Sequence, residues 1–405
     1  MTDAPSALPV TVLSGFLGSG KTTLLQSLLL QARRAEGVRL GVIVNEMSEL
    51  DVDGRVLDAG EIISRRDALF VSIPAGSISG PTGLQRFAAA IDEFAASRAS
   101  HVVIETSGSA HPWPLLEAIR THPQARLHGF LSVVDAVALA HDHDLGRGIV
   151  PAASRNLAAG RRKSENLLAE QIMFGNRILL SKMDRVDADT LRAVAEAVHA
   201  INPFADVLGM KWGNLKLADV LATPPYDHDR VATLGAELAD WDREHGVRSM
   251  ESAADYRIDS VVVADPRPFH PRRLWNVYNH FLGEGVFRSK GFFWLPTRDK
   301  LQLLWNQTAG SIGLEIVNYW KIATLEDESL NLSPEEQSEM RLRLQAFSPE
   351  FGDRHCRLTV IAERDGLQTF ADALNACFCT PAEVARWKAG GDFDDPWPTT
   401  IARLN

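Results

Sequence analysis

The stretch Gly15-Phe16-Leu17-Gly18-Ser19-Gly20-Lys21-Thr22 has the pattern GxxxxGK[ST] and decides how the first half of the chain folds. An apolar run with β-branched residues, 8–13, precedes it, and a run of good helix formers, 23–30, follows it. A glycine-rich turn between a strand and a helix points backbone N–H groups at phosphate oxygens, and the helix dipole adds positive potential there. The sequence therefore predicts a phosphate-binding loop that joins a strand to a helix.

The side chains of this loop have separate expected roles. Lys21 is expected to reach the β- and γ-phosphates of a nucleotide and to stabilise charge on the transferring phosphoryl group. The hydroxyl of Thr22 is expected to bind magnesium. The residues that we expect to contact the nucleotide in this segment are Gly15, Gly18, Ser19, Gly20, Lys21, Thr22 and Thr23.

Composition argues against several other classes of protein. The chain has 405 residues, which suggests two or three domains, and its formal net charge of -10 argues against a basic nucleic-acid surface. Its three cysteines are too few for a disulfide framework. We see no secretory signal near the start and no apolar run of the roughly 18 residues that a membrane span needs. The expectation is a soluble cytoplasmic protein that binds neither nucleic acid nor membrane.

A second strand candidate, residues 40–44, ends at Asn45 and Glu46. In open α/β sheets, ligands bind at the carboxyl ends of the strands. The Glu46 carboxylate is therefore a candidate magnesium ligand, directly or through water, or a residue that orders a switch loop. An ordinary solvated strand end is an equally good interpretation of this one acid.

A further apolar run, residues 101–104, ends in Glu105 and continues through Thr106 into Ser107 and Gly108. An apolar strand that ends in an acid and continues into a small-residue loop has the form of a Walker B element. Glu105 is expected to hold the magnesium ion or its water and to be catalytic together with Lys21. The backbone of Ser107 and Gly108 is expected to sense the γ-phosphate, as switch loops do.

The third motif is Ser181-Lys182-Met183-Asp184, which follows the strand candidate 177–180 and resembles the guanine-reading N-K-x-D of GTPases. Asp184 can accept hydrogen bonds from the N1–H and the exocyclic amine of guanine, and adenine lacks both donors. The Lys182 stem is expected to pack on the base. Ser181 stands where asparagine is more usual.

The predicted fold is an α/β P-loop GTPase domain with a mainly parallel sheet, followed by a smaller α+β domain. The first domain is expected over residues 8–225, and an acidic segment at 226–255 is expected to be a linker with one short helix. Strand and helix candidates mix over residues 256–380, which form the second domain, and residues 381–405 form a tail.

Taken in order, these motifs resemble those of the CobW-type GTPases, a family of metal-centre chaperones or insertases related to the nickel and urease maturation GTPases. The resemblance implies magnesium-dependent GTP hydrolysis and often the handling of zinc, cobalt or iron. It covers nearly the whole chain, and the segments that carry it are 15–25, 44–46, 105–108, 133–136, 181–184, 269–274, 288–291 and 351–354.

One departure from the family pattern concerns its metal-binding loop. The family usually carries C-x-C-C after its third strand, and the matching positions here are Ser77, Ser79 and Gly80. Serine is a hard, poor ligand for zinc or cobalt, and glycine offers no side chain. The resemblance therefore implies a degenerate metal loop beside a complete nucleotide site.

Three explanations of this departure remain open. The chain can use other ligands, such as Glu46, His111 or groups of the second domain, although His111 is more readily interpreted as a surface histidine. It can assist an apo-enzyme without carrying metal, or it can derive from a parent with cysteines. Cys377 and Cys379 are two soft ligands at best, and small buried residues at a helix end are the better interpretation.

Our first hypothesis is a GTP-hydrolysing maturation factor that serves a client metalloenzyme or apo-enzyme. The second is a nucleotide-gated protein-binding scaffold that carries no metal and hydrolyses GTP negligibly. A small-molecule kinase on the same loop is a third, and the motif at 181–184 argues against it because that motif selects guanine. No motif selects a client or an oligomeric state.

Overall fold

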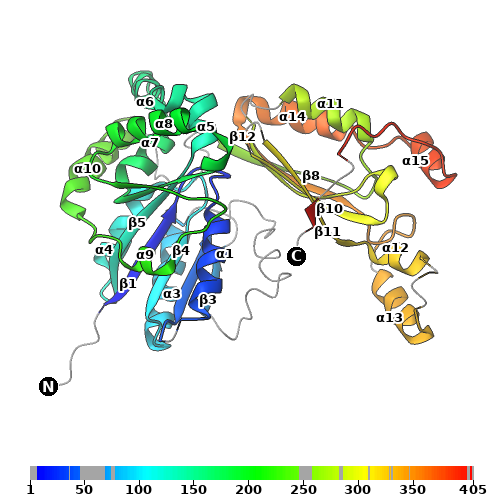
Figure 1. Cartoon of the computed structure of the whole chain (residues 1–405), viewed down its shortest axis with the longest axis horizontal. Coiled ribbons are helices and arrows are strands. Elements are labelled where there is room, and N and C mark those ends of the chain that lie inside the picture. Colours follow the sequence, from blue (N-terminus) through cyan, green and yellow to red (C-terminus); the bar gives the residue numbers. More distant parts are fainter. Residues whose placement is uncertain are drawn as a thin grey trace. The chain divides into compact units, whose positions relative to one another are not determined.

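The chain forms two compact units, residues 1–258 and 259–405, which are described separately (Figure 1). The computed structural model describes residues 7–35, 37–45, 69–73, 78–245, 258–281, 286–308, 311–327, 329, 332–345, 347–398 and 402–403.

Seven parallel strands form the sheet of the first unit, in the order β3-β2-β4-β1-β5-β6-β7. Strand β1 lies between β4 and β5, so the loop after β1 leaves the middle of the carboxyl edge, where ligands bind in such sheets. The strands are β1 (Leu8–Ser14), β2 (Leu40–Asn45), β3 (Leu69–Ile73), β4 (His101–Glu105), β5 (Ala125–Asp135), β6 (Arg177–Ser181) and β7 (Asp206–Gly209).

Helices cover both faces of this sheet. Alternate residues of a strand point to opposite faces, so Val12 packs in one apolar cluster with α3 and α4, and Leu13 packs in another with α1 and α9. The result is a three-layer α/β/α arrangement, and the predicted α/β fold with a mainly parallel sheet is confirmed. The helices are α1 (Lys21–Ala32), α3 (Pro81–Ala96), α4 (Pro112–Thr121), α5 (Ala136–Asp142), α6 (Ile149–Ala158), α7 (Ser164–Phe174), α8 (Ala188–Ile201), α9 (Leu217–Leu221) and α10 (His228–Glu244), with 3-10 turns at Asp144–Gly146 and Met183–Arg185.

The segment predicted as an acidic linker is not one over most of its length. Residues 228–244 form the long helix α10, which packs its apolar stripe, Val231 and Leu238, into the core of the first unit. The hydroxyl of Tyr226 donates a hydrogen bond of 2.8 Å to the carbonyl of Phe174. Only one stripe of α10 is apolar, so its average composition resembles that of a linker although the helix is docked.

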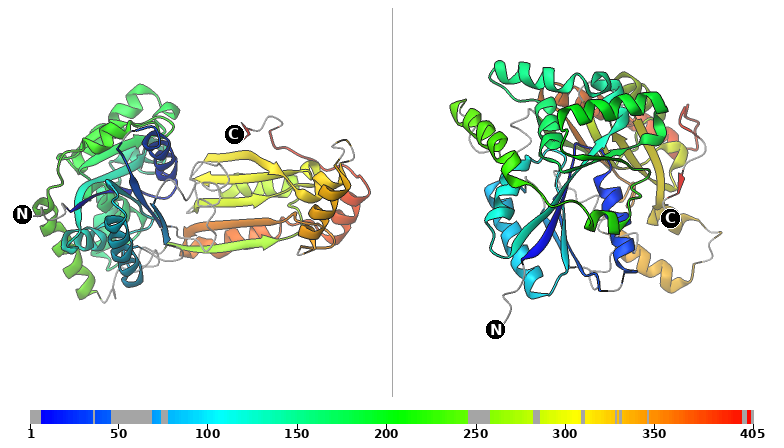
Figure 2. Two further views of the ribbon diagram at one scale, coloured as in Figure 1. Left: turned by 90° about the horizontal axis from the view of Figure 1, so that it is seen from below. Right: turned by 60° about the vertical axis from the view of Figure 1, so that its left-hand side comes forward.

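The second unit is built on a six-stranded sheet in the order β13-β11-β10-β9-β12-β8. The pairs β11–β10, β10–β9 and β9–β12 are antiparallel, and Figure 2 shows α11 and α14 along one face of the sheet. Its elements are β8 (Ile258–Asp265), α11 (Pro271–Phe281), β9 (Val286–Phe293), a 3-10 turn (Pro296–Arg298), β10 (Leu301–Thr308), β11 (Ser311–Tyr319), α12 (Lys321–Glu326), α13 (Pro334–Leu344), β12 (Cys356–Glu363), α14 (Arg364–Asn375), α15 (Pro381–Lys388) and β13 (Ala402–Arg403).

Residues expected to form a tail belong to the core of this unit. Trp397 is buried, and its indole N–H donates to the carbonyl of Pro271 at 3.1 Å. Arg298 donates to the carbonyls of Trp397 and Pro398, which holds this segment against the 3-10 turn at Pro296–Arg298. Trp397 also lies edge-on to Trp305 and Trp275, so the last part of the chain completes an aromatic core.

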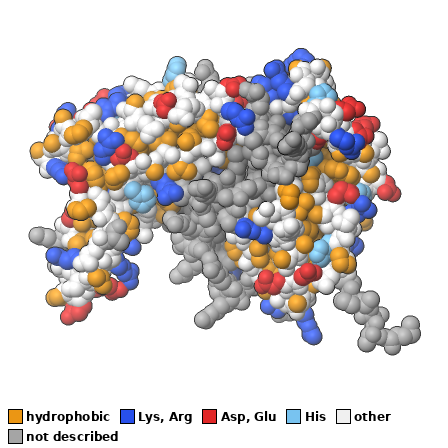
Figure 3. Space-filling view, turned by 180° about the vertical axis from the view of Figure 1, so that it is seen from behind, with side chains coloured by type: hydrophobic (Ala, Val, Ile, Leu, Met, Phe, Trp, Pro, Cys, Tyr) orange, Lys and Arg blue, Asp and Glu red, His pale blue; other side chains and the backbone are white. Residues whose placement is uncertain are grey.

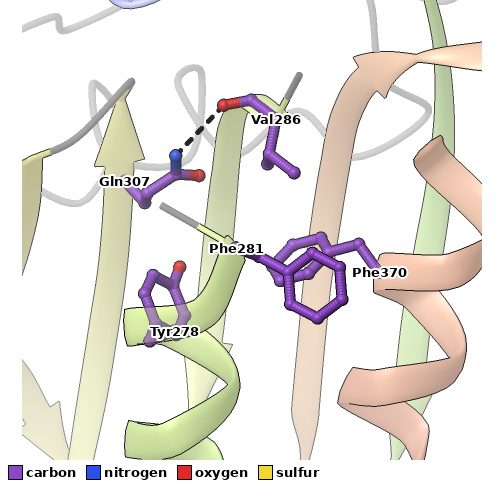
Figure 4. A pocket seen from close by; sticks show the side chains of 5 residues that line it. All are labelled: Tyr278, Phe281, Val286, Gln307 and Phe370. Carbon is purple, nitrogen blue, oxygen red and sulfur yellow. Dashed lines mark hydrogen bonds between the residues drawn. The ribbon is translucent and has the colours of Figure 1, made fainter. Parts of the chain in front are cut away.

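A small apolar recess of the second unit, shown in Figure 4, lies among side chains of α11, α14 and the sheet. The side-chain amide of Gln307 donates to the carbonyl of Val286 at 3.3 Å. The recess leaves no room for a water molecule, so it is a packing feature of the core. Its lining residues are Tyr278, Phe281, Val286, Gln307 and Phe370.

The described surface carries charges of both signs. On the face shown in Figure 3, Lys and Arg side chains are interspersed with Asp and Glu side chains. Among the described residues, no helix combines the length and the apolar character that are needed to cross a membrane.

Two helical glycines should respond to alanine in opposite directions. A Cβ atom at Gly235 of α10 would lie 2.3 Å from the Trp113 ring, so Gly235→Ala should lower the free energy of unfolding by about 1–3 kcal/mol. A Cβ atom at Gly366 of α14 would meet nothing within 4 Å. Gly366→Ala should therefore raise the free energy of unfolding by about 0.5–1 kcal/mol. Urea unfolding of both variants and the wild type tests this. A stabilising Gly235→Ala would show that α10 does not dock on α4.

Candidate functional site

The predicted nucleotide-contact residues of the first motif form one continuous turn from the end of β1 into α1. Gly15 has a φ of +140°, and a Cβ atom there would lie 2.1 Å from the carbonyl oxygen of Val133 in β5. Only glycine fits this approach. Gly20, with a φ of +102°, turns the chain into the helix. The loop is thereby closed tightly over the carboxyl edge of the sheet.

Lys21 and Ser19 place polar groups inside this loop. The ammonium of Lys21 is buried and donates to the carbonyls of Gly15 at 2.6 Å and Phe16 at 3.1 Å. The hydroxyl of Ser19 is also buried, and it has no hydrogen-bond partner among the described residues. Since a buried hydroxyl without a partner is costly, a ligand oxygen is a fitting partner for it. The charge of Lys21 suits an anionic ligand such as phosphate.

Thr22 and Glu105 come together as the sequence predicted. The parallel register of β1 and β4 pairs Leu13 with Glu105, which brings the carboxylate to the start of α1. The Thr22 hydroxyl donates to Glu105 Oε1 at 2.6 Å, and Glu105 is buried. A hydroxyl and a carboxylate are hard oxygen ligands of the kind that Mg²⁺ prefers. These two residues therefore fit a magnesium ion.

The loop after β4 lies against the phosphate-binding loop. A Cβ atom at Gly108 would lie 2.5–2.7 Å from atoms of Leu17, so the two loops touch through backbone. The Gly108 carbonyl accepts a hydrogen bond of 3.2 Å from Gln171. Ser107 is buried beside it. The loop that carries Ser107 and Gly108 therefore lies directly beside the phosphate-binding loop.

Asn45 joins three loops, a role that the sequence did not reveal. Its Oδ1 accepts from the backbone N–H of Ile78 at 3.0 Å and of Ser107 at 3.3 Å. Its Nδ2 donates to the carbonyl of Ile73 at 3.2 Å. The only signal in the sequence was its place at the end of a strand. Glu46, the next residue, lies outside the described residues.

The guanine-type motif is fixed to the same loop. The hydroxyl of Ser181 donates to the carbonyl of Ser19 at 2.6 Å. Lys182 has a φ of +54°, and its ammonium forms an ion pair with Asp135 at the end of β5. Asp184 is exposed in the 3-10 turn that follows, where its carboxylate is accessible to a ligand. Ser181 thus connects the motif at 181–184 to the phosphate-binding loop.

Asp135 is a further residue whose role the sequence did not reveal. Its carboxylate caps α5 by accepting from the N–H groups of Val137 at 2.9 Å and Ala138 at 3.3 Å, and it also pairs with Lys182. This ion pair holds the stem of Lys182 in one direction. The ends of β1, β4, β5 and β6 therefore contribute to one site.

Two family models match the sequence. One, described as CobW/HypB/UreG, nucleotide-binding domain, matches residues 9–209, and the other, described as cobalamin synthesis protein cobW C-terminal domain, matches residues 258–378. The chain belongs to the CobW family. Its resemblance to that family, inferred from the ordered motifs, is thus confirmed.

Two curated relatives and one solved structure are similar to this chain. This CobW-family protein is 28% identical to the zinc-regulated GTPase metalloprotein activator 1 of Dictyostelium discoideum, with 97% of this chain and 83% of the relative covered. It is 28% identical to the zinc chaperone CobW of a Sinorhizobium species, with 77% and 87% covered. The crystal structure of zinc-bound YjiA GTPase from E. coli matches with 18% identity and a TM-score of 0.36, over 92% of this chain and all of that one.

The degenerate metal loop of this CobW-family protein is partly described. Ser79 is buried, and its hydroxyl donates to the carbonyl of His111 at 2.6 Å. Gly80 is the N-cap of α3, and Ser77 lies outside the described residues. Among the residues that the structure describes, no group of three or more His, Cys, Asp or Glu side chains is arranged to hold a metal ion.

His111 is not a surface residue, so that interpretation is wrong, and its ring is held by contacts within the protein. Its side chain is buried, Nδ1 accepts from the N–H of Trp113 at 3.2 Å, and Nε2 lies 2.9 Å from Glu170. Both ring nitrogens are therefore engaged. Cys377 and Cys379 are buried as predicted, and burial raises the pKa of each thiol to about 12. A metal ligand must be the thiolate, and burial makes the thiolate more costly to form at these two positions.

A buried charge network runs from His111 to α10. Glu170 of α7 pairs with His111 and with Arg162, and the Nε of Arg162 lies 3.0 Å from Asp242 of α10. All four side chains are buried. Through this network the loop after β4 is connected to α10.

Removing Arg162 should strongly destabilise the first unit. Arg162→Met leaves the carboxylates of Glu170 and Asp242 buried without their guanidinium, and breaking a buried pair in this way costs about 3–5 kcal/mol. Arg192 pairs with Asp189 on the surface, so Arg192→Met serves as the control and should leave stability unchanged. Urea unfolding measures both. Equal stability of the two variants would contradict a structural role for the network.

Proposed function

We propose that this chain is a GTP-binding and GTP-hydrolysing metallochaperone or maturation factor that assists metal-centre assembly in a client enzyme in the cytoplasm. The observation that carries the nucleotide part is the 2.6 Å contact of Thr22 with Glu105 beside a closed phosphate-binding loop. The functions of the two relatives, a zinc-regulated metalloprotein activator and a zinc chaperone, support the metal part.

The residues of the loop divide the work on the phosphates. Lys21, already held against the carbonyls of Gly15 and Phe16, would turn its charge to the β- and γ-phosphates. Thr22 and Glu105 would hold magnesium, which when bound neutralises charge on these phosphates. Ser19, whose hydroxyl is buried beside the loop, would donate to a phosphate oxygen.

Guanine recognition would fall to the motif at 181–184. Asp184 would accept the N1–H and amine hydrogens of the base, and the stem of Lys182 would pack on its face. Ser181 and Asp135 support this arrangement because they fix the motif to the phosphate-binding loop and fix Lys182 in direction. The distance between the base and phosphate subsites is thereby held constant.

Asn45 offers a route from the nucleotide to the neighbouring loop. It accepts from Ser107, in the loop expected to sense the γ-phosphate, and from Ile78, in the degenerate metal loop. A change of the first loop between GTP and GDP would therefore move the second. Such coupling would let hydrolysis end the interaction with a client.

A second candidate function is a nucleotide-gated scaffold that carries no metal and hydrolyses GTP negligibly. The observation that favours it is Ser79, which takes the place of a family cysteine and is buried with its hydroxyl bonded to the carbonyl of His111. This position therefore supplies no thiolate. Zinc, cobalt or iron carried as cargo would need other ligands.

Metal titration of the purified chain, loaded with GDP or with a non-hydrolysable GTP analogue and magnesium, tests these candidates. Zn²⁺, Co²⁺ and Fe²⁺ are titrated against a chelator, and phosphate release from GTP is measured in parallel. For the metallochaperone we expect GTP hydrolysis and tight binding of one metal that changes with the nucleotide. Cys377→Ser with Cys379→Ser should leave that binding unchanged, because both thiols are buried in the core of the second unit and belong to no group of three or more metal-ligating side chains among the described residues. Metal binding no tighter than that of surface histidines, with GDP and with the GTP analogue alike, together with no GTP hydrolysis, would support the scaffold instead.

The base specificity of Asp184 can be reversed. Asp184→Asn replaces one acceptor by a donor, which suits the C2 carbonyl of xanthine and not the amine of guanine. GTP affinity should fall about 10- to 100-fold, and xanthosine triphosphate should bind better than GTP. Asp189→Asn, an exposed change in the first turn of α8, is the control. Isothermal titration with both nucleotides measures the outcome, and unaltered GTP affinity in Asp184→Asn would remove Asp184 from the site.

A further inference from the structure

A tight turn at the end of β7 presents an exposed tryptophan in an unusual backbone conformation. Trp212 and Gly213 have φ values of +54° and +68°, and Asn214 donates its N–H to the carbonyl of Lys211 at 2.8 Å. Two successive left-handed residues characterise a type I′ turn, which normally carries Asn, Asp or Gly. A bulky aromatic residue at positive φ is strained, and Trp212 is nevertheless 74% exposed.

This turn contacts the candidate nucleotide site on both sides, at the motif 181–184 with the strand before it and at the start of α1. On one side, the N–H of Met210 donates to the carbonyl of Leu180 at 2.8 Å, and a Cβ atom at Gly209 would lie 2.7 Å from the sulfur of Met183. On the other side, a Cβ atom at Gly213 would lie 2.8 Å from the backbone of Thr23. The turn therefore lies between the guanine-type motif and the first turn of α1.

Trp212 is highly exposed, whereas the side chains of the other two tryptophans of the first unit pack against neighbouring rings. Trp113 packs against Phe174, and Trp241 stacks on His245 at 4.1 Å and lies against Arg162. Trp212 lies just beyond residue 209, where the match to the nucleotide-binding family model ends. Strain in the backbone is often kept at ligand sites, where a bound molecule compensates for it.

We propose that the indole of Trp212 forms one wall of the base subsite and stacks on guanine, with the stem of Lys182 as the other wall. This inference rests on the proposed guanine-nucleotide binding. Stacking needs only a flat aromatic face, so it adds affinity for any base, while Asp184 supplies the selectivity. The contribution of Trp212 should therefore be equal for GTP and GDP.

Isothermal titration of GDP and of a non-hydrolysable GTP analogue tests the proposal. Trp212→Ala should weaken both by the same factor, between about 5-fold and 150-fold, the range measured for base–aromatic stacking. Trp212→Phe should recover most of the affinity, because an aromatic ring remains. Phe204→Ala is the matched control, since Phe204 is also 74% exposed but precedes β7 at the opposite edge of the sheet.

A spectroscopic measurement gives a second readout that does not depend on the stability of the alanine variant. Stacked guanine quenches indole fluorescence, so GDP should lower the emission of the wild type and lower it less in Trp212→Phe. An affinity of Trp212→Ala within twofold of the wild type, or an unchanged quench in Trp212→Phe, would overturn the role of Trp212 while guanine binding stands. A wild type that binds no guanine nucleotide would overturn both.

Discussion

The parallel pairing of β1 with β4 and β5 is the constraint on which the candidate site depends. It places Glu105 beside Leu13, from where the carboxylate reaches Thr22, and it places the Val133 carbonyl against Gly15. A slip of this register by one residue would reverse the faces of the strand and separate the carboxylate from the loop. The apolar residues that alternate along β1 fix the register, since both faces of the strand are buried. The packing of the core therefore determines the positions of the site residues in this unit.

Around this centre, single side chains connect loops that are distant in sequence. Ser181 connects the base motif to the phosphate-binding loop, and Asn45 connects the ends of β2 and β3 to the loop after β4. Each of these bonds joins a side chain to a backbone group, so it fixes the path of a loop regardless of its sequence. A nucleotide that moves one loop would therefore move its neighbours.

The parts of the molecule that the sequence could predict are those with a local pattern. The phosphate-binding loop, the strand that ends in Glu105 and the motif at 181–184 depend on residues that are adjacent along the chain. Docking of α10 was not predictable in this way, because one apolar stripe on an acidic helix is difficult to distinguish from a solvated segment. The burial of Trp397 and the position of Trp212 also depend on contacts between residues far apart in sequence. Such contacts leave no periodic signal.

The buried charges of the first unit have a consequence for how this chain can vary. His111, Glu170, Arg162 and Asp242 come from four separate segments, and each one compensates another inside the core. A substitution at any one of them leaves a neighbour with an unmatched charge or hydrogen-bonding group, whereas a joint replacement by apolar residues does not. These four positions should therefore be inherited as a set, and in descendants of this chain they should be lost or exchanged together.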